Sequence, residues 1–368
     1  MNPAPHSARL SAGRLGLLLA AAAVPVSLLW DYAWETTVGI DRVWAPPHAA
    51  TYAAMLLAAG AALGLLGRAE GVRVGKWRAP LGAWVALWGA GAFVAAFFFD
   101  RWWQAGYGLA AGLWHPPQLL KAAAFFAVLA GAWLAAAGAQ ERRGGALAFA
   151  VAGGWLLALL GVVTLAGNFA NRQHAATFYQ VACGTYPIVL AACARAGRLR
   201  WPATTAALAA TLLGGAMVWL LPLIPGTPLV APIYNARDHL LAPPFPLLLV
   251  APALALDALL RVFPGRAGRS AEWSRAVEGG LAFFVVFLAV QWPFAQFLLS
   301  PAAEHWCFAG GGKEWPFFLK IDPSARAAFW PAPGDELTLA NALRAAGLAV
   351  LATRLGLWMG AWMQRLRR

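Results

Sequence analysis

The stretch that decides the fold is residues 145–167, GALAFAVAGGWLLALLGVVTLAG, which contains no charged side chain. An α-helix needs about 20 apolar residues to cross roughly 30 Å of hydrocarbon, so this stretch is long enough to span a membrane. The rest of the chain has the same character, since 61% of its 368 residues are hydrophobic and 12% are charged. Soluble domains carry about 25% charged residues. The composition therefore excludes a water-soluble globule and predicts a membrane protein.

Ten apolar segments of this kind can be marked along the chain. The first follows Arg9 and Arg14 in the manner of a signal peptide, but it contains no clear small-residue cleavage site, so we interpret it as a retained span. The sequence thus predicts an all-α fold, a polytopic transmembrane helical bundle of about ten spans built from repeated helical hairpins. The predicted spans are 15–34, 47–67, 80–100, 116–138, 145–167, 176–195, 201–222, 241–262, 276–299 and 338–361.

The charged residues alternate with these segments. If the N-terminus is inside, that side of the membrane receives 19 of the 28 Lys and Arg residues and five of the 15 acidic residues. Loops on the cytoplasmic side of membrane proteins are enriched in Lys and Arg. We therefore expect a multi-pass protein of a bacterial-type inner (plasma) membrane, with both termini cytoplasmic. The net charge of +13 is then a topological signal, and no nucleic-acid partner is expected.

An internal repeat relates the first two pairs of segments. Residues 30–52 read WDYAWETTVGIDRVWAPPHAATY, and residues 99–121 read FDRWWQAGYGLAAGLWHPPQLLK. In each copy an Asp ends one segment, a Gly follows eight residues later, and Pro-Pro opens the next segment. The repeat predicts two parts in the chain. Residues 1–140 form a duplicated helical-hairpin pair, and residues 141–368 form further hairpins with a long outer loop at 300–337.

Three side chains in the first copy are candidate metal ligands. Asp31 and Glu35 are four residues apart and share one helix face, and His48 opens the returning helix. Two carboxylates and an imidazole are a credible ligand set for a transition metal. Asp41, between them, is a spare ligand or a hydrogen-bond acceptor for the imidazole N–H. The alternative is that these residues are interfacial polar groups that cap helices at the water boundary.

The same residues carry a resemblance to a known family. Asp31-x3-Glu35-x12-His48 is similar to the Asp-x3-His-x12-His pattern in the C subunit of the copper-dependent membrane monooxygenases of ammonia and methane, where an Asp also lies between the histidines and a Pro precedes the last one. The resemblance covers about residues 28–135. It implies a metal site at the outer membrane face, with copper as the metal.

The second copy resembles the second pattern of that family, Asn-x3-His-x13-His. The corresponding residues are Asp100, Gln104 and Gln118. Both family histidines are glutamines here, and amide oxygens are poor ligands for a soft metal. We therefore expect a degenerate site without metal, in which the three side chains hydrogen-bond to each other. In the first copy Glu35 replaces a family histidine, and this harder ligand set also suits zinc, iron or manganese.

The resemblance implies oxygen chemistry on a small apolar or ammonia-like substrate, in a complex with other subunits. Two alternatives stay open: a non-catalytic metal-handling or assembly partner in a membrane complex, and a carrier for an apolar solute. The expected partners are membrane lipid, together with other subunits or a second copy of the chain. Ionisable groups are almost absent from the middle of the predicted spans, which argues against an ion-coupled transporter.

Other residues predicted at the outer face are weaker candidates for metal ligands. His174 and His239 open predicted helices at the depth of His48, and His305 lies two residues before Cys307 in the long outer loop. The first two are candidates for a shared His-rich vestibule, and the last two for a metal-binding pair. For each of them the alternative is a histidine whose hydrogen bonds are satisfied at the membrane interface.

Overall fold

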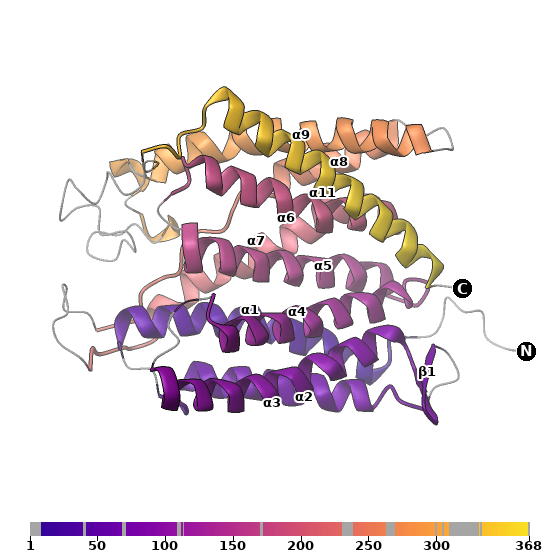
Figure 1. The fold of residues 1–368 in the computed structure, drawn as a ribbon, viewed down its shortest axis with the longest axis vertical. Helices are drawn as coiled ribbons and strands as arrows, with labels where there is room; N and C mark the ends of the chain where they lie inside the picture. Colours follow the sequence, from indigo (N-terminus) through magenta and orange to yellow (C-terminus); the bar gives the residue numbers. More distant parts are fainter. Residues whose placement is uncertain are drawn as a thin grey trace, which may run out of the picture.

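The computed structural model describes residues 9–366, apart from residues 40–41, 68–70, 109–111, 113, 170–171, 230–237, 263–268, 299, 304, 309–330 and 332. Within this part of the chain, long helices run side by side along one direction (Figure 1), and the predicted all-α transmembrane bundle is confirmed. The helices are α1 (Ala12–Thr37), α2 (Pro46–Leu63), α3 (Leu81–Tyr107), α4 (Pro116–Ala137), α5 (Gly145–Gly161), α6 (Ala176–Ala196), α7 (Pro202–Leu220), α8 (Val250–Val262), α9 (Arg269–Leu298) and α11 (Leu339–Arg365). Two short strands, β1 (Val72–Val74) and β2 (Trp77–Ala79), form a hairpin between α2 and α3.

Eight of these helices are long and apolar enough to cross a membrane, so the chain is a multi-pass membrane protein. The other two are α2, with 18 residues, and α8, with 13 residues. The sequence of α2 begins Pro-Pro-His, and these polar or helix-opening residues lower its mean hydropathy. It still pairs along its length with α1 and completes the first hairpin.

The predicted span 241–262 is wrong in its first half. Residues 241–249 are not helical, although most of them are buried, and α8 begins only at Val250. Pro243, Pro244 and Pro246 explain the difference, because proline removes a helical hydrogen bond and clashes with the preceding turn. Apolar composition was enough to mark this segment as buried, but not to make it a helix.

The span predicted at 145–167 also changes form within its length. Its first part is α5, and the chain continues as a π-helix over Val162–Phe169. Thr164 lies in this π-helix and donates a hydrogen bond from its hydroxyl to the carbonyl of Leu160, at 2.6 Å. Its Oγ1 accepts one from Tyr186 of α6, at 2.9 Å, so the altered turn is tied to the neighbouring helix.

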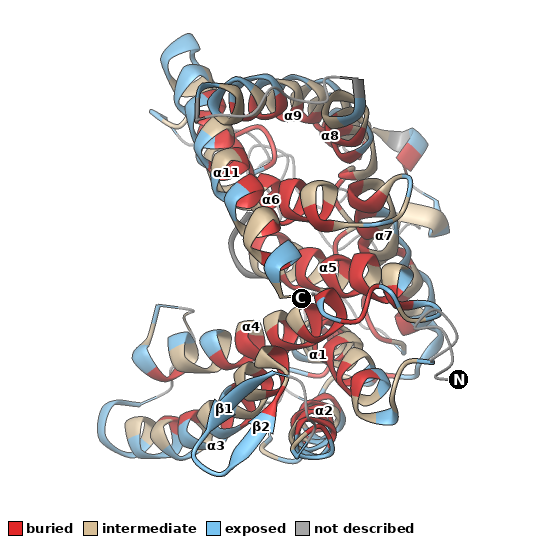
Figure 2. Ribbon diagram, turned by 90° about the vertical axis from the view of Figure 1, so that its right-hand side faces the viewer, coloured by how far each residue is buried: buried red, intermediate tan, exposed pale blue. Residues whose placement is uncertain are grey.

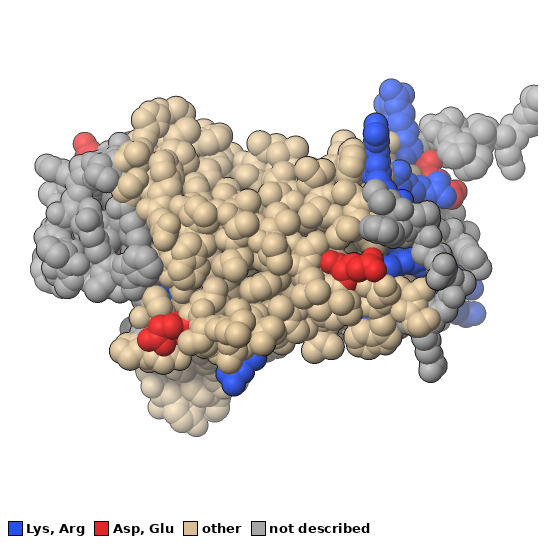
Figure 3. Space-filling view, turned by 90° about the horizontal axis from the view of Figure 1, so that it is seen from above, with Lys and Arg blue, Asp and Glu red and all other residues tan. Residues whose placement is uncertain are grey.

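Both ends of the described chain lie at one end of the bundle (Figure 1). Arg9 forms a backbone bridge with Arg143, and the carbonyl of Leu366 approaches Gly138, so both ends meet the turn between α4 and α5. Lys and Arg gather at this same end in Figure 3, while the broad middle of that face carries few charges. The described ends of the chain therefore lie on the basic side of the bundle.

Close helix packing depends on small residues at the crossing points. The buried residues lie where the helices face each other (Figure 2), and α3 packs on α4 through glycines. A methyl group added at Gly131 of α4 would lie 2.6 Å from the backbone nitrogen of Ala86 of α3. Such residues let helix backbones approach closely in a membrane, where no hydrophobic effect drives helices together.

Candidate functional site

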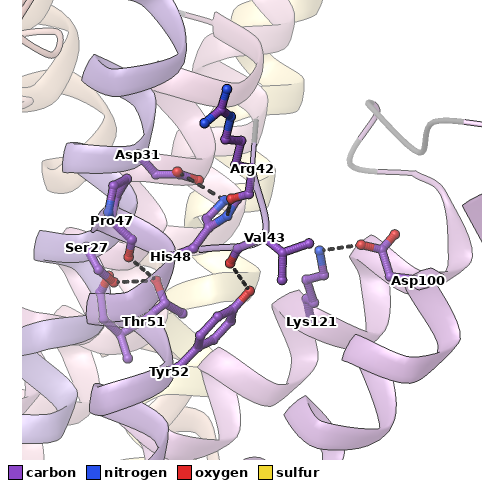
Figure 4. Close-up of polar contacts among 11 residues, drawn as sticks. Ser27, Asp31, Arg42, Val43, Pro47, His48, Thr51, Tyr52, Asp100 and Lys121 are labelled. Atoms are coloured by element: carbon purple, nitrogen blue, oxygen red, sulfur yellow. Dashed lines mark hydrogen bonds and ion pairs between the residues drawn. The ribbon is translucent and has the colours of Figure 1, made fainter. Parts of the chain in front are cut away.

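The first hairpin brings two of the predicted ligands together. α1 runs past its apolar core to Thr37, so Asp31 is helical, and α2 begins at Pro46, which places His48 in its first turn. The Nε2 atom of His48 lies 3.2 Å from Oδ1 of Asp31 (Figure 4). Both side chains are about one-fifth exposed, at 22% for His48 and 21% for Asp31. The pair is thus accessible at the end of the hairpin where α1 leads into α2.

A hydroxyl pair holds the two helices in this register. The Thr51 hydroxyl donates to Oγ of Ser27 at 2.9 Å, one turn deeper than the Asp31–His48 pair (Figure 4). Both residues are buried, with 6% exposure for Thr51 and 1% for Ser27. Each hydroxyl also has a carbonyl acceptor on its own helix, Val24 for Ser27 and Pro47 for Thr51, so the pair adds one hydrogen bond between the helices in this register.

The contact of the other ring nitrogen of His48, Nδ1, shows that this nitrogen is protonated. Nδ1 lies 2.9 Å from the carbonyl oxygen of Arg42, and a carbonyl oxygen only accepts hydrogen bonds, so Nδ1 carries the proton. Tyr52 orients the segment that contains Arg42, because the Tyr52 hydroxyl donates to the carbonyl of the next residue, Val43, at 2.9 Å. A neutral imidazole protonated on Nδ1 would direct the Nε2 lone pair at a carboxylate. The contact is favourable only with a proton on Nε2 or a cation between the two groups.

Glu35 and Asp41 do not complete a three-ligand cluster in the described residues. Glu35 is exposed and lies one turn beyond Asp31 on α1. No group of three or more His, Cys, Asp or Glu side chains gathers closely enough to bind a metal in the part of the chain that the structure describes. Asp41 lies outside those residues. The structure therefore brings two of the predicted ligands into contact, Asp31 and His48, and places Glu35 one turn further along the same helix.

In the second hairpin, the corresponding Asp contacts a lysine ammonium group. Lys121 Nζ lies 2.9 Å from Oδ2 of Asp100, and the same oxygen accepts a hydrogen bond from Nε2 of Gln104 at 3.2 Å. Asp100 is only 8% exposed, so this carboxylate is a largely buried anion paired with an ammonium group. The predicted Gln104–Asp100 hydrogen bond is confirmed. Gln118 lies in the first turn of α4, and His115, which precedes that turn, bonds through Nδ1 to Gly112 in its own loop.

Sequence reasoning missed the role of Lys121. The internal repeat nevertheless contains a signal that distinguishes this residue. Lys121 comes four residues after the second proline of its Pro-Pro pair, and Thr51 has that position in the first copy. The two copies therefore differ at the same place. One Asp has a tethered ammonium, and the other has an imidazole with a hydroxyl pair beneath it.

The remaining histidines do not join His48 in one site. His174 is fully buried, and its ring contacts Trp292 of α9 edge-on, with centroids 4.6 Å apart. His239 lies 2.7 Å from Asp238, and this hydrogen bond lowers the pKa of the exposed Asp238 carboxyl below its usual value. His305 accepts a hydrogen bond from the backbone N–H of Cys307, two residues away. The contacts of His239 and His305 lie within their own segments, whereas His174 packs against a residue of another helix.

Comparison with known proteins adds no family to this description. No family model matches the chain, and no curated protein or solved structure matches it significantly. The case for function therefore rests on the residues of the two hairpins themselves.

Proposed function

We propose that this protein binds one transition-metal ion at the outer end of the α1–α2 hairpin. Asp31 and His48 are the ligands already in contact, and Glu35, one turn along α1, is the third. Asp41 is the acceptor or spare ligand of the connecting loop. The observation that carries this proposal is the orientation of His48, whose Nδ1–H is held by the Arg42 carbonyl while Nε2 points at a carboxylate.

This arrangement matches what a metal-bound histidine requires. A metal-ligating imidazole usually donates its second ring N–H to a carbonyl or carboxylate, which fixes the tautomer and the ring plane. Here the carbonyl of Arg42 has that role, and Nε2 points at the Asp31 carboxylate. A set of two carboxylates and one imidazole suits zinc, manganese or iron, and also copper in its divalent state. By resemblance to the monooxygenase C subunits, copper is the metal we propose.

The second hairpin supports the proposal as an internal comparison. The Asp100 carboxylate is neutralised by Lys121, an ammonium that the chain itself supplies. The first hairpin has Thr51 at the corresponding position, and its Asp31 contacts the imidazole of His48 in place of a lysine. A bound metal ion is the cation that would make the two hairpins electrostatically equivalent. The second hairpin, by the same argument, needs no metal.

In function, the protein would then be a metal-binding subunit of a membrane complex, oriented with both termini in the cytoplasm of a bacterial-type cell. A bound copper ion would supply oxygen chemistry on a small apolar or ammonia-like substrate. The protein residues bind the ion, orient His48 and, through the Trp44–Tyr52–Phe97 aromatic cluster, shield the side of the site that faces α3. The partial exposure of the ligands equally favours a non-catalytic subunit that passes metal to a partner.

The test is metal content. The protein is purified in mild detergent without chelators, and the bound metal is measured by elemental analysis, with about one ion per chain expected. His48→Ala removes a ligand, so metal content should fall to background. His239→Ala is the matched control, because it deletes another outer-face histidine that also contacts an Asp, and it should retain the metal.

Two results would overturn the proposal. One is a wild-type protein without metal above background, even after it is incubated with copper or zinc and washed. The other is a His48→Ala protein that retains its metal. A thermal unfolding profile of each variant shows that any loss of metal is not a loss of folding.

A further inference from the structure

An apolar pocket lies on the other side of α1 from the Asp31–His48 pair. It is bounded by α1, α5, the π-helix, α7 and the non-helical segment 241–249. Its lining includes Leu29, Leu157, Leu165, Leu213, Leu247 and Leu249, and the polar residue in the lining is Thr211. The cavity volume is about 40 Å³. A buried water needs about 10–15 Å³ on the same measure, so the pocket accommodates a small group of atoms and no bulky cofactor.

The pocket exists because two helices diverge. α5 and α7 are in close contact at Gly154, where an added methyl group would lie 2.6 Å from the carbonyl oxygen of Ala206. At Gly161, two turns further along α5, an added methyl group would have nothing within 4 Å. Gly161 lines the pocket, so its missing side chain leaves open space there.

The wall opposite α5 is built from irregular backbone that is held in place. Leu248 donates its backbone N–H to Oε1 of Gln291, whose Nε2 donates to Gln173 at 2.7 Å, and both glutamines are 1% exposed. Leu241 donates its N–H to the hydroxyl of Thr37 of α1. Backbone that is not helical persists at membrane depth only where protein groups satisfy it or where it lines a cavity. Both conditions hold here.

The two prolines of this wall offer a ligand no hydrogen-bond donor. Pro244 and Pro246 line the pocket and have no N–H, so each can only accept a hydrogen bond, at its carbonyl oxygen. The π-helix forms the neighbouring wall, and such distortions are frequent at functional sites. On α7, Leu208 and Leu212 next to the pocket are exposed at 46% and 58% on the surface that faces lipid. The helix that forms one wall of the pocket therefore also carries exposed leucines.

We propose that this pocket binds the end of a phospholipid acyl chain. Three features support this occupant: the apolar lining, a volume that fits a few methylene groups, and a wall formed by α7, which carries the exposed leucines Leu208 and Leu212. The chain end would fill the space between α5 and α7 that Gly161 leaves open. This site is independent of the metal site, because Leu29 lines the pocket whereas Asp31 contacts α2 on the other side of α1.

The test uses photolabelling in lipid vesicles. The protein is reconstituted with phosphatidylethanolamine that carries a diazirine near the end of one acyl chain, and labelled peptides are identified by mass spectrometry. We expect labels on the pocket residues of α7 and of segment 241–249. Gly161→Leu fills the pocket without a backbone clash and should lower this labelling severalfold. Gly91→Leu is the matched control, because nothing lies within 4 Å of an added methyl group there either, and it should leave the pocket labels unchanged.

A second arm separates lipid from free hydrocarbon. A short diazirine-bearing alkane is added to vesicles that contain unlabelled lipid. If the free alkane labels the pocket and the lipid probe does not, an acyl chain is not the occupant and the proposal falls. It also falls if the lipid labels the pocket peptides equally in the wild type and in Gly161→Leu, provided that both proteins unfold at the same temperature.

Discussion

At the residue scale, the imidazole of His48 was predictable and the ammonium of Lys121 was not. Spacing alone predicted that Asp31 and His48 meet, because an Asp at the end of one helix and a His at the start of the next face each other across a tight hairpin. Spacing also predicted that Glu35 shares the face of Asp31 as a third ligand. In the structure the Glu35 side chain is exposed. Lys121 escaped attention because its partner Asp100 is 21 residues away and on another helix.

The first prediction concerns Thr51, the counterpart of Lys121. Thr51→Lys places an ammonium group below Asp31, where it competes with a metal ion for the carboxylate, so bound metal should fall more than about tenfold. Thr51→Val removes the same hydroxyl without adding charge and should retain the metal. Elemental analysis of the two purified variants measures the difference. Equal metal content in both would contradict the idea that Lys121 substitutes for a metal.

The second prediction concerns Lys121 itself. Lys121→Met leaves the Asp100 carboxylate buried without its ammonium, which should lower the free energy of unfolding by about 3 kcal/mol. The double variant Asp100→Asn with Lys121→Met removes both charges and should recover much of that loss. Thermal unfolding in detergent compares the three proteins. A single variant as stable as the wild type would show that this pair contributes little.

At the element scale, hydropathy predicted where the chain is buried more reliably than which backbone it adopts. Nine of the ten predicted segments coincide with helices in the described chain, because long apolar runs in a bilayer must satisfy their own backbone. The exception, 241–249, is as apolar as its neighbours, but its prolines remove backbone donors, and buried glutamines compensate. That compensation comes from residues more than 40 positions away, which no local pattern contains.

The third prediction tests close packing between α3 and α4. Gly131→Leu forces a side chain against the backbone of Ala86 and should destabilise the protein by about 1–3 kcal/mol through overpacking. Gly91→Leu, on α3, adds the same atoms where nothing lies within 4 Å, so its unfolding temperature should stay near that of the wild type. Thermal unfolding in detergent distinguishes them. The packing argument fails if both variants lose equal stability.

At the scale of the whole molecule, the charge pattern and the fold agree. The end of the bundle where both described ends of the chain lie is also the basic end seen in Figure 3. The positive-inside rule associates such an end with the cytoplasm. Lys and Arg gather at that end in the described chain because each helical hairpin returns the chain to the same side.

The fourth prediction is the orientation in the membrane. A fluorescent protein fused after residue 368 should fluoresce in the cytoplasm, and a periplasmic reporter inserted in the loop 300–337 should be active. Each Lys or Arg near an anionic inner leaflet is worth about 1 kcal/mol, so the inverted orientation is strongly disfavoured. If the loop reporter is cytoplasmic, the Asp31–His48 pair faces the cytoplasm as well.

Both described ends of the chain lie beside the α4–α5 turn, so the order of the two halves in the sequence could be exchanged without moving a helix. A circular permutant could join residue 366 to residue 9 by a short linker and begin instead at Gly145, the first residue of α5. The ribosome would then deliver α5 to α11 before the metal-site hairpins, with every helix keeping its direction across the bilayer. If this permutant still binds metal, the two hairpins that hold Asp31 and Asp100 can insert into an already assembled bundle, and their place at the start of the chain is not required for folding.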